Sequence, residues 1–164
     1  MSTKGKTRDA IKVRGFFRVN IVEDQEGKQK IVGDSGWREN TVVNLGFDQF
    51  LCQTLAGMAG SKTVSHVALG TGGAPAAADT SLAGEIMSST QRKTVSPSTI
   101  ASKTAQFTAA FASADSFLTA AANLSNIGLF NTSTEGTVFA ANTYTSSACA
   151  TNQSVNVTYQ IRFS

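Results

Sequence analysis

Few side chains in this sequence could support nucleophilic, acid–base or metal chemistry. His66 is the single histidine, which excludes a metal site with two histidine ligands. A catalytic triad would also have to use His66, yet the chain has no G-x-S-x-G motif to present a serine nucleophile. We therefore interpret His66 as a structural residue within a strand.

The acidic and glycine-rich segments are no better suited to catalysis. Asp79 and Glu85 flank a short polar segment, but this spacing does not show two carboxylates converging on a cleft. We expect Asp79 to cap a turn or a short helix, with Glu85 in its first turn. The run Gly70–Gly73 lacks the Gly-Lys-Ser/Thr of a phosphate loop, so we predict a tight turn there.

The two cysteines, Cys52 and Cys149, are too few and too far apart in sequence for a disulfide scaffold or a zinc site. We expect both to be buried thiols. The sequence thus predicts no catalytic residue, no cofactor-binding residue and no metal ligand, and we expect the protein not to be an enzyme.

Charge is distributed unevenly along the chain, although the net charge is only +3. Six basic residues fall within residues 1–18, where Asp9 is the only acid: Lys4, Lys6, Arg8, Lys12, Arg14 and Arg18. Such an arm could bind nucleic acid through phosphates or an acidic protein surface through ion pairs, or it could be a solvated tail.

The second half of the chain is poor in charge. From residue 104 to residue 161 the only charged side chains are Asp115 and Glu135. Soluble monomers usually spread charged residues over their surface. We interpret this half either as surface covered by neighbouring subunits or as polar surface made of Ser, Thr, Asn and Gln.

Length and composition indicate one folded domain. The chain has 164 residues, of which 41% are hydrophobic and 15% charged, which is too apolar for a disordered chain. No apolar run approaches the roughly 18 residues of a membrane span, and the charged start does not resemble a signal peptide. We expect a basic arm over residues 1–10 and a single domain over residues 11–164, made in a cytoplasm.

Alternation of apolar and polar residues predicts a mainly β protein. Strict alternation covers residues 154–163, and residues 10–22 alternate with only Phe16 out of phase. Residues 23–28 are predicted to form a polar turn with a glycine, and residues 30–33 the returning strand of a hairpin. Further strands are predicted over residues 37–43, 63–70, 91–95, 100–112, 122–130 and 138–142. Strands and helices do not alternate as a parallel sheet requires, so we predict an antiparallel β-sandwich, jelly-roll-like in form.

One short α-helix is predicted near residues 46–59. An apolar stripe at helical spacing supports it: Phe47, Phe50, Leu51, Leu55 and Met58. Asn44 is a candidate N-cap and Gly60 a candidate stop signal. We expect this stripe to pack in the core, a long turn over residues 70–79, and one helical turn over residues 81–87.

Four segments resemble, in chain order, a group of small structural proteins of tailed bacteriophage virions. They are ENTVVNLG at 39–46, HVALGTGGAPAAADTSLAGE at 66–85, NIGLFN at 126–131 with GTVFA at 136–140, and VNVTYQIRF at 155–163. The resemblance runs from about Ile11 onward, and residues 68–85 are its most specific part. It implies a non-enzymatic, β-rich virion subunit of the capsid, tail or fibre. Members of the group commonly have a Glu before the Gly-Leu-Phe segment, where this chain has Asn126.

The resemblance and the charge pattern together suggest a capsid decoration or cement protein. Such a protein would form a homo-oligomer, for which we expect a trimer, and would bind the major capsid protein of the assembled virion. The residues we expect at the lattice contact are Lys4, Lys6, Arg8, Lys12 and Arg14. We expect no membrane contact and no direct binding to nucleic acid, because Phe17 is in phase with the core and leaves no stacking platform.

Two other classes of function remain open. A tail, baseplate or fibre component would bind tail proteins or a host surface. A sugar-binding role would need exposed aromatic residues in loops, and we expect Trp37 to lie in the core instead. A small hydrolase or a nucleic-acid-binding protein is the remaining alternative.

Overall fold

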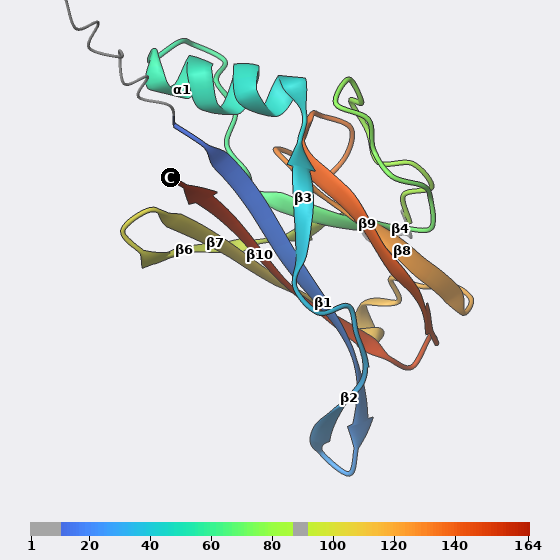
Figure 1. Cartoon of the computed structure of the whole chain (residues 1–164). Coiled ribbons are helices and arrows are strands. Elements are labelled where there is room, and N and C mark those ends of the chain that lie inside the picture. Colours follow the sequence, from blue (N-terminus) through green and yellow to red (C-terminus); the bar gives the residue numbers. More distant parts are fainter. Residues whose placement is uncertain (1–10, 87–91) are drawn as a thin grey trace, which may run out of the picture.

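The computed structural model describes residues 11–86 and 92–164, which form a mainly antiparallel sheet nearly closed into a barrel (Figure 1). The ten strands of these residues are β1 (Val13–Gln25), β2 (Lys28–Asp34), β3 (Arg38–Val42), β4 (His66–Gly70), β5 (Lys93–Thr94), β6 (Ser96–Ala101), β7 (Thr104–Phe111), β8 (Ala122–Phe130), β9 (Val138–Cys149) and β10 (Ser154–Phe163). Their order in the sheet is β5-β4-β8-β9-β3-β1-β10-β7-β6, with β2 paired to β1.

The sheet bends at two corners, where the chain passes from one half of the sheet into the other. The first part of β3 pairs with β1, whereas Thr41 and Val42 pair with β9. On the opposite side, β5 pairs with β4 and β6 pairs with β7, and only Val95 separates β5 from β6. These two corners bring the two halves of the sheet face to face.

The core lies between these halves. Phe17 of β1 contacts Tyr159 of the neighbouring β10, with ring centroids 5.7 Å apart, and Tyr144 of the facing β9 at 6.0 Å. All three side chains are buried, and the Tyr159 hydroxyl accepts a hydrogen bond from Asn40 Nδ2. The alternation in β1 and β10 is therefore explained by one face turned toward this core.

Several sequence predictions are confirmed in these strands. The predicted strands over residues 122–130 and 154–163 coincide with β8 and β10. The predicted polar turn joins β1 and β2 as a hairpin, with Glu26 at φ 55° and Gly27 at φ 77°. Two successive positive φ values are typical of tight hairpin turns. The hairpin extends away from the barrel, and β2 is exposed along nearly its whole length (Figure 1).

The long strand predicted over residues 100–112 is wrong as a single element. The chain turns at residues 102–103, so that β6 and β7 form a hairpin. The inward face of β7 consists of Phe107 and Ala109, which pack against the core, and Phe111, which is buried in it. The helical turn predicted over residues 81–87 is absent from residues 81–86, and Met87 lies outside the described residues.

The predicted helix is shorter than expected and does not bury its apolar stripe. It consists of a π-helical segment, η1 (Gly46–Cys52), followed by α1 (Gln53–Leu55). Another short helix, η2 (Ser113–Asp115), lies elsewhere in the chain, before β8. No helix of the described residues is long and apolar enough to cross a membrane. The predicted N-cap at Asn44 is wrong, because the N-cap of η1 is Leu45, which makes no side-chain capping bond. The backbone N–H of Asn44 donates to Ala77 O at 2.8 Å.

The position of the helix explains this exposure. Phe50 is buried against Phe139, with ring centroids 5.1 Å apart, and Leu51 is partly buried. The other three members of the predicted core stripe are exposed, Leu55 by 91%: Phe47, Leu55 and Met58. The helix covers one end of the barrel rather than a sheet face, so only the residues that point into the barrel contact its core (Figure 1).

Two further burial predictions are wrong in part. Cys149 is buried, and burial raises the pKa of its thiol to about 11, but Cys52 is exposed on the helix. Trp37 is 45% exposed in the turn between β2 and β3 rather than buried in the core. The spacing of apolar residues along a strand or helix does not reveal such exposure. Cys52 lies on the helix at the barrel end and Trp37 in a turn, so neither is part of the barrel wall.

Residues 71–86 cover the outer face of β4, β8 and β9. Leu82 packs there in a second, smaller apolar cluster with Ala68 and Phe130. Asn126 Nδ2 holds this covering loop by donating hydrogen bonds to Ala83 O at 2.8 Å and Gly73 O at 3.3 Å. Residues 67–70, 126–130 and 138–141 of these strands are thus buried on both faces, which explains why these stretches are almost entirely apolar.

A buried ion pair fixes the end of the covering loop. Arg92 Nε and Nη2 lie 2.6 and 3.0 Å from the two carboxylate oxygens of Glu85, and both side chains are at most 10% exposed. The guanidinium also stacks 3.5 Å from the centroid of the Phe130 ring and donates to the backbone oxygens of Thr132 and Glu135. Glu85 is therefore a partner of Arg92 and not the first-turn residue of a helix.

We predict that Glu85→Ala will destabilise the fold by about 3–5 kcal/mol, because it leaves the Arg92 guanidinium buried without its counter-charge. Urea unfolding at neutral pH measures this change. The matched control is Glu39→Ala, which breaks an exposed pair with Arg14 and should cost at most about 1 kcal/mol. Equal losses in the two variants would contradict the prediction.

Candidate interaction surface

Lys12 and Arg14, two of the residues expected at a partner contact, lie at one end of the sheet. The backbone N–H of Lys12 donates to Ser164 O at 2.7 Å, and the N–H of Ser164 donates to Lys12 O at 2.9 Å. Arg14 of β1 lies directly opposite Arg162 of β10 in the antiparallel register of the two strands. The other three expected residues, Lys4, Lys6 and Arg8, lie outside the described residues.

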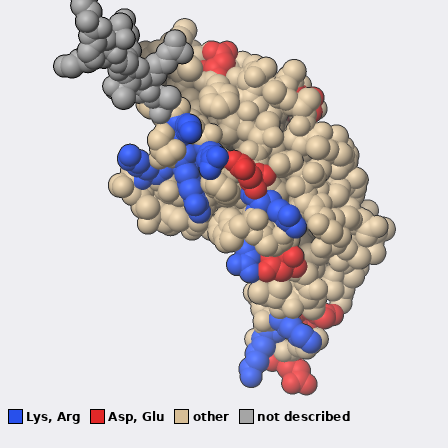
Figure 2. Space-filling view, viewed as in Figure 1, with Lys and Arg blue, Asp and Glu red and all other residues tan. Residues whose placement is uncertain are grey.

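Two further basic residues lie at the same end. Arg162 faces outward beside Arg14, and Lys103 is in the β6–β7 turn, where its backbone oxygen accepts a hydrogen bond from Phe163 N at 2.9 Å. Lys12, Arg14, Lys103 and Arg162 are all exposed, and we call them the basic cluster. Figure 2 shows Lys and Arg side chains gathered over this end of β1 and β10.

Within the described residues, the basic cluster has little compensating negative charge. Arg14 Nε lies 3.6 Å from Glu39 Oε1, but both side chains are about 60% exposed, and such pairs contribute little to binding or stability. Arg162 donates to Gln160 Oε1 from Nε at 3.2 Å and from Nη2 at 2.7 Å. It also stacks over the Phe16 ring at 4.5 Å. Its guanidinium is thus oriented by neutral partners and not by a carboxylate.

Arg18 lies farther along β1 and is neutralised. Arg18 Nε and Nη2 lie 3.0 and 2.5 Å from the two carboxylate oxygens of Asp34. This hydrogen bond, together with one from the backbone N–H of Gly36, lowers the pKa of Asp34 to about 2. The positive surface therefore ends before Arg18, although the sequence places this residue in the same basic run.

The residues considered for catalysis do not converge. His66 Nδ1 lies 2.8 Å from Ser65 Oγ, and burial and the charge of Arg92 lower the pKa of the ring. Asp79 accepts a hydrogen bond from Ala76 N at 2.8 Å within a turn, whereas Glu85 is committed to Arg92. Among residues 11–86 and 92–164, no group of three His, Cys, Asp or Glu side chains could hold a metal ion.

The tight turn predicted at Gly70–Gly73 is wrong: Gly70 ends β4, and Gly72 and Gly73 lie in an irregular loop with no positive φ. Close packing explains Gly70 and Gly72 instead. A Cβ on Gly72 would lie 2.2 Å from Ala83 O, and one on Gly70 would lie 2.3 Å from Asn126 Oδ1. Only glycine allows the covering loop to approach its neighbours so closely. The backbone of this segment is therefore occupied by contacts within the chain.

The sequence did not identify Lys103 and Arg162 as part of the surface. Period-two alternation places Arg162 on the polar face of its strand, but it does not show which strand lies beside it. The pairing of β1 with β10, which brings Arg14 next to Arg162, joins segments from opposite ends of the chain. Only the sheet register reveals that the basic arm leads onto a larger basic surface.

Protein-family models, curated proteins and solved structures contain no match to this chain. The role of the surface has to be inferred from its own residues. The basic cluster, the charge-poor strands β4, β8 and β9, and the exposed residues of the helix are the features that a function must explain.

We predict that Asp34→Asn will lower stability at neutral pH and have little effect near pH 2. The pKa of Asp34 in the folded chain is lowered from 3.8 to about 2, so its stabilisation is present above pH 4 and is lost as the pH falls through about 2. Urea unfolding of both proteins at pH 7, 4 and 2 measures the effect. A difference in stability that is the same at all three pH values would rule out this role for Asp34.

Proposed function

We propose that this protein is a non-enzymatic structural protein of a bacteriophage virion that decorates the capsid and stabilises the assembled lattice as a homo-oligomer. The observation that carries the proposal is the basic cluster, which extends the basic arm of Lys4, Lys6 and Arg8 onto the folded surface. The proposed partners are the major capsid protein and further copies of this chain, within the virion. The resemblance of residues 66–85 to phage virion proteins supports the same role.

The physical basis of this role is electrostatic attraction to an acidic surface. Lys12, Lys103 and Arg162 form no ion pair among the described residues, so their charge is available to a partner. A ligand that binds only the assembled lattice stabilises that lattice by mass action. Because the contributing groups are exposed, the attraction should weaken with salt.

Contact between copies is supported by the ends of β8 and β9 that the covering loop leaves exposed. Neither strand contains Lys, Arg, Asp or Glu. The exposed side chains at these ends are neutral, as at Asn123, Thr145 and Ser146. Interface centres are depleted in charged residues, so this surface suits packing against an identical subunit. We also propose that the nearly closed sheet belongs with the jelly-roll-like sandwiches, which is supported by its two facing halves.

We predict that reversing charge in the basic cluster, as in the double variant Lys12→Glu, Arg14→Glu, will weaken binding to purified capsids of the source virus roughly tenfold at low salt. The matched control, Lys28→Glu, Lys30→Glu, makes the same change in net charge on the exposed β2 strand. Co-sedimentation with capsids measures both affinities. Equal weakening in the two double variants would reject the basic cluster as the contact.

The number of copies per virion tests the role itself. Cryo-electron microscopy should find this chain on the shell in a ratio near one to one, or a fixed simple fraction, to the major capsid protein. A few copies at a single vertex would contradict the decoration role and would favour a tail location.

Trp37 favours one alternative, a tail, baseplate or fibre component that contacts tail proteins or a host surface. Its indole is 45% exposed in the β2–β3 turn, and exposed aromatic rings can stack on sugar rings. The turn is well ordered by its neighbours, since Gly36 N–H donates to Asp34 Oδ1 at 2.8 Å and Arg38 Nε donates to Ser35 O at 3.1 Å.

Trp37 is the single tryptophan of the chain, so its fluorescence reports directly on this turn. The decoration role predicts that host cell-surface polysaccharide leaves its emission unchanged, and that Trp37→Ala binds capsids as the parent does. Emission that is quenched in a saturable manner by the polysaccharide would favour the fibre role instead.

A further inference from the structure

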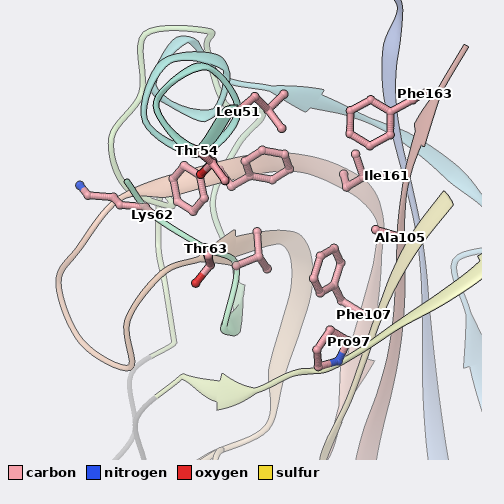
Figure 3. Close-up of a pocket in the computed structure, with 12 residues that line it drawn as sticks. Leu51, Thr54, Lys62, Thr63, Pro97, Ala105, Phe107, Ile161 and Phe163 are labelled. Carbon is pink, nitrogen blue, oxygen red and sulfur yellow. The ribbon is translucent and has the colours of Figure 1, made fainter. Parts of the chain in front are cut away.

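Arg162 lies on the outer face of β10, away from the apolar groove beneath the helix. Its neighbours Ile161 and Phe163 line that groove, so the side chain between them points to the opposite face of the strand (Figure 3). On this outer face Arg162 lies beside Arg14 of β1, and Gln160 occupies the preceding outward position of β10. Because the Arg162 side chain is exposed, its guanidinium is within reach of another molecule.

Three contacts orient this guanidinium before any partner binds. Arg162 Nε and Nη2 both donate to Gln160 Oε1, at 3.2 and 2.7 Å. Gln160 is only 5% exposed, and its Nε2 donates to Gln106 Oε1 at 2.9 Å, so the acceptor oxygen is held in place. The guanidinium carbon also lies over the Phe16 ring, 4.5 Å from its centroid. Arg162 therefore has little rotamer freedom left to lose when it binds a partner.

One edge of the guanidinium has no partner among the residues that the structure describes. An arginine has five N–H donors, and the bonds to Gln160 use the edge formed by Nε and Nη2. The edge formed by Nη1 and Nη2 faces no acceptor in residues 11–86 and 92–164. Two parallel N–H donors on one edge match the two oxygens of a carboxylate. Arg162 thus has the form of a preoriented carboxylate site.

Arg14 brings a second positive charge to the same level of the sheet. Residues directly opposite each other in antiparallel strands have Cβ atoms roughly 4.5–5.5 Å apart, and like charges there are destabilising. Glu39 offsets little of this repulsion, since its carboxylate lies 3.6 Å from Arg14 in an exposed pair. A carboxylate bound beside the two arginines would remove the repulsion. Local conflicts of this kind are expected at functional sites.

The surroundings of Arg162 favour one kind of anion. A single-stranded nucleic acid would use an open aromatic ring for base stacking, but the guanidinium covers the Phe16 ring. A second copy of the chain would offer the acids of its β1–β2 hairpin, where Asp24 and Glu26 are followed by two exposed lysines. Such mixed charge is a poor complement to a basic cluster. A different protein with exposed Asp or Glu side chains fits better.

We propose that Arg162 is the anchor of the basic cluster and binds one Asp or Glu side chain of the partner protein through its free edge, with Gln160 as its positioning residue. Arg14 adds a second attraction to the same carboxylate. Lys12 and Lys103 are exposed nearby and attract the partner at longer range. The acidic nature of the partner is taken from the proposed function, on which this inference rests.

A peptide of six glutamates tests the carboxylate site without any capsid. The Nε–Hε signal of Arg162 in the NMR spectrum of the ¹⁵N-labelled full chain reports on the guanidinium directly. At low salt we expect the peptide to shift this signal several-fold more than that of Arg18, which Asp34 already neutralises. A thymidine oligonucleotide of similar charge should shift it less. An equal or larger shift with the oligonucleotide, or no larger shift at Arg162 than at Arg18, would overturn the proposal.

Two pairs of variants separate orientation from charge. Gln160→Glu gives Arg162 a carboxylate within the chain, so it should weaken peptide binding about as much as Arg162→Gln does. Its matched control, Gln106→Glu, adds the same charge one strand away and should retain most of the affinity. Arg162→Lys should lose several-fold more affinity than Arg14→Lys, because lysine cannot form two parallel bonds. Equal effects within either pair would refute the anchor role, and the lysine pair decides if Gln160→Glu does not fold.

Failure of the anchor site and failure of the decoration role would be seen in different experiments. If the peptide leaves Arg162 unshifted while the Lys12, Arg14 double variant still weakens capsid binding, the anchor role is refuted and the decoration role stands. If the peptide binds at Arg162 but the chain is not found on the shell, the carboxylate site stands and the decoration role is refuted.

Discussion

The buried ion pair between Glu85 and Arg92 is the interaction on which the rest of the structure depends. It joins the end of the covering loop to the start of β5, and Arg92 also holds the loop between β8 and β9 through backbone oxygens. Burying two charges is costly unless geometry and hydrogen bonds are good, and both conditions are met in this pair.

The sequence was sufficient for the elements whose residues alternate between core and solvent. β8 and β10 were predicted at their observed bounds, and the hairpin between β1 and β2 was evident from its polar turn with Gly27. The helix shows the limit of such patterns. Phe50 and Leu55 belong to one helical stripe, yet one is buried and the other exposed, because only part of the helix contacts the barrel end.

The candidate site was predictable only in part, for a topological reason. Lys12 and Arg14 stand out in the sequence as a basic run, but Arg162 joins them only because β1 and β10 are neighbours in the sheet. Arg18 belongs to the same run and yet is neutralised, because Asp34 faces it across the β1–β2 hairpin. A count of charged residues along the sequence therefore overestimates the positive charge of the surface at Arg18 and misses the contribution of Arg162.

The β1–β2 hairpin has a consequence for how this protein could be used. It extends from the barrel at the end opposite the basic cluster, and its tip at Glu26 and Gly27 is exposed (Figure 1). Exposed tips of this kind tolerate inserted sequence, because the inserted residues displace no core contact. A peptide tag or an antigen placed there would leave the basic cluster free, so the hairpin tip is the natural attachment point for cargo.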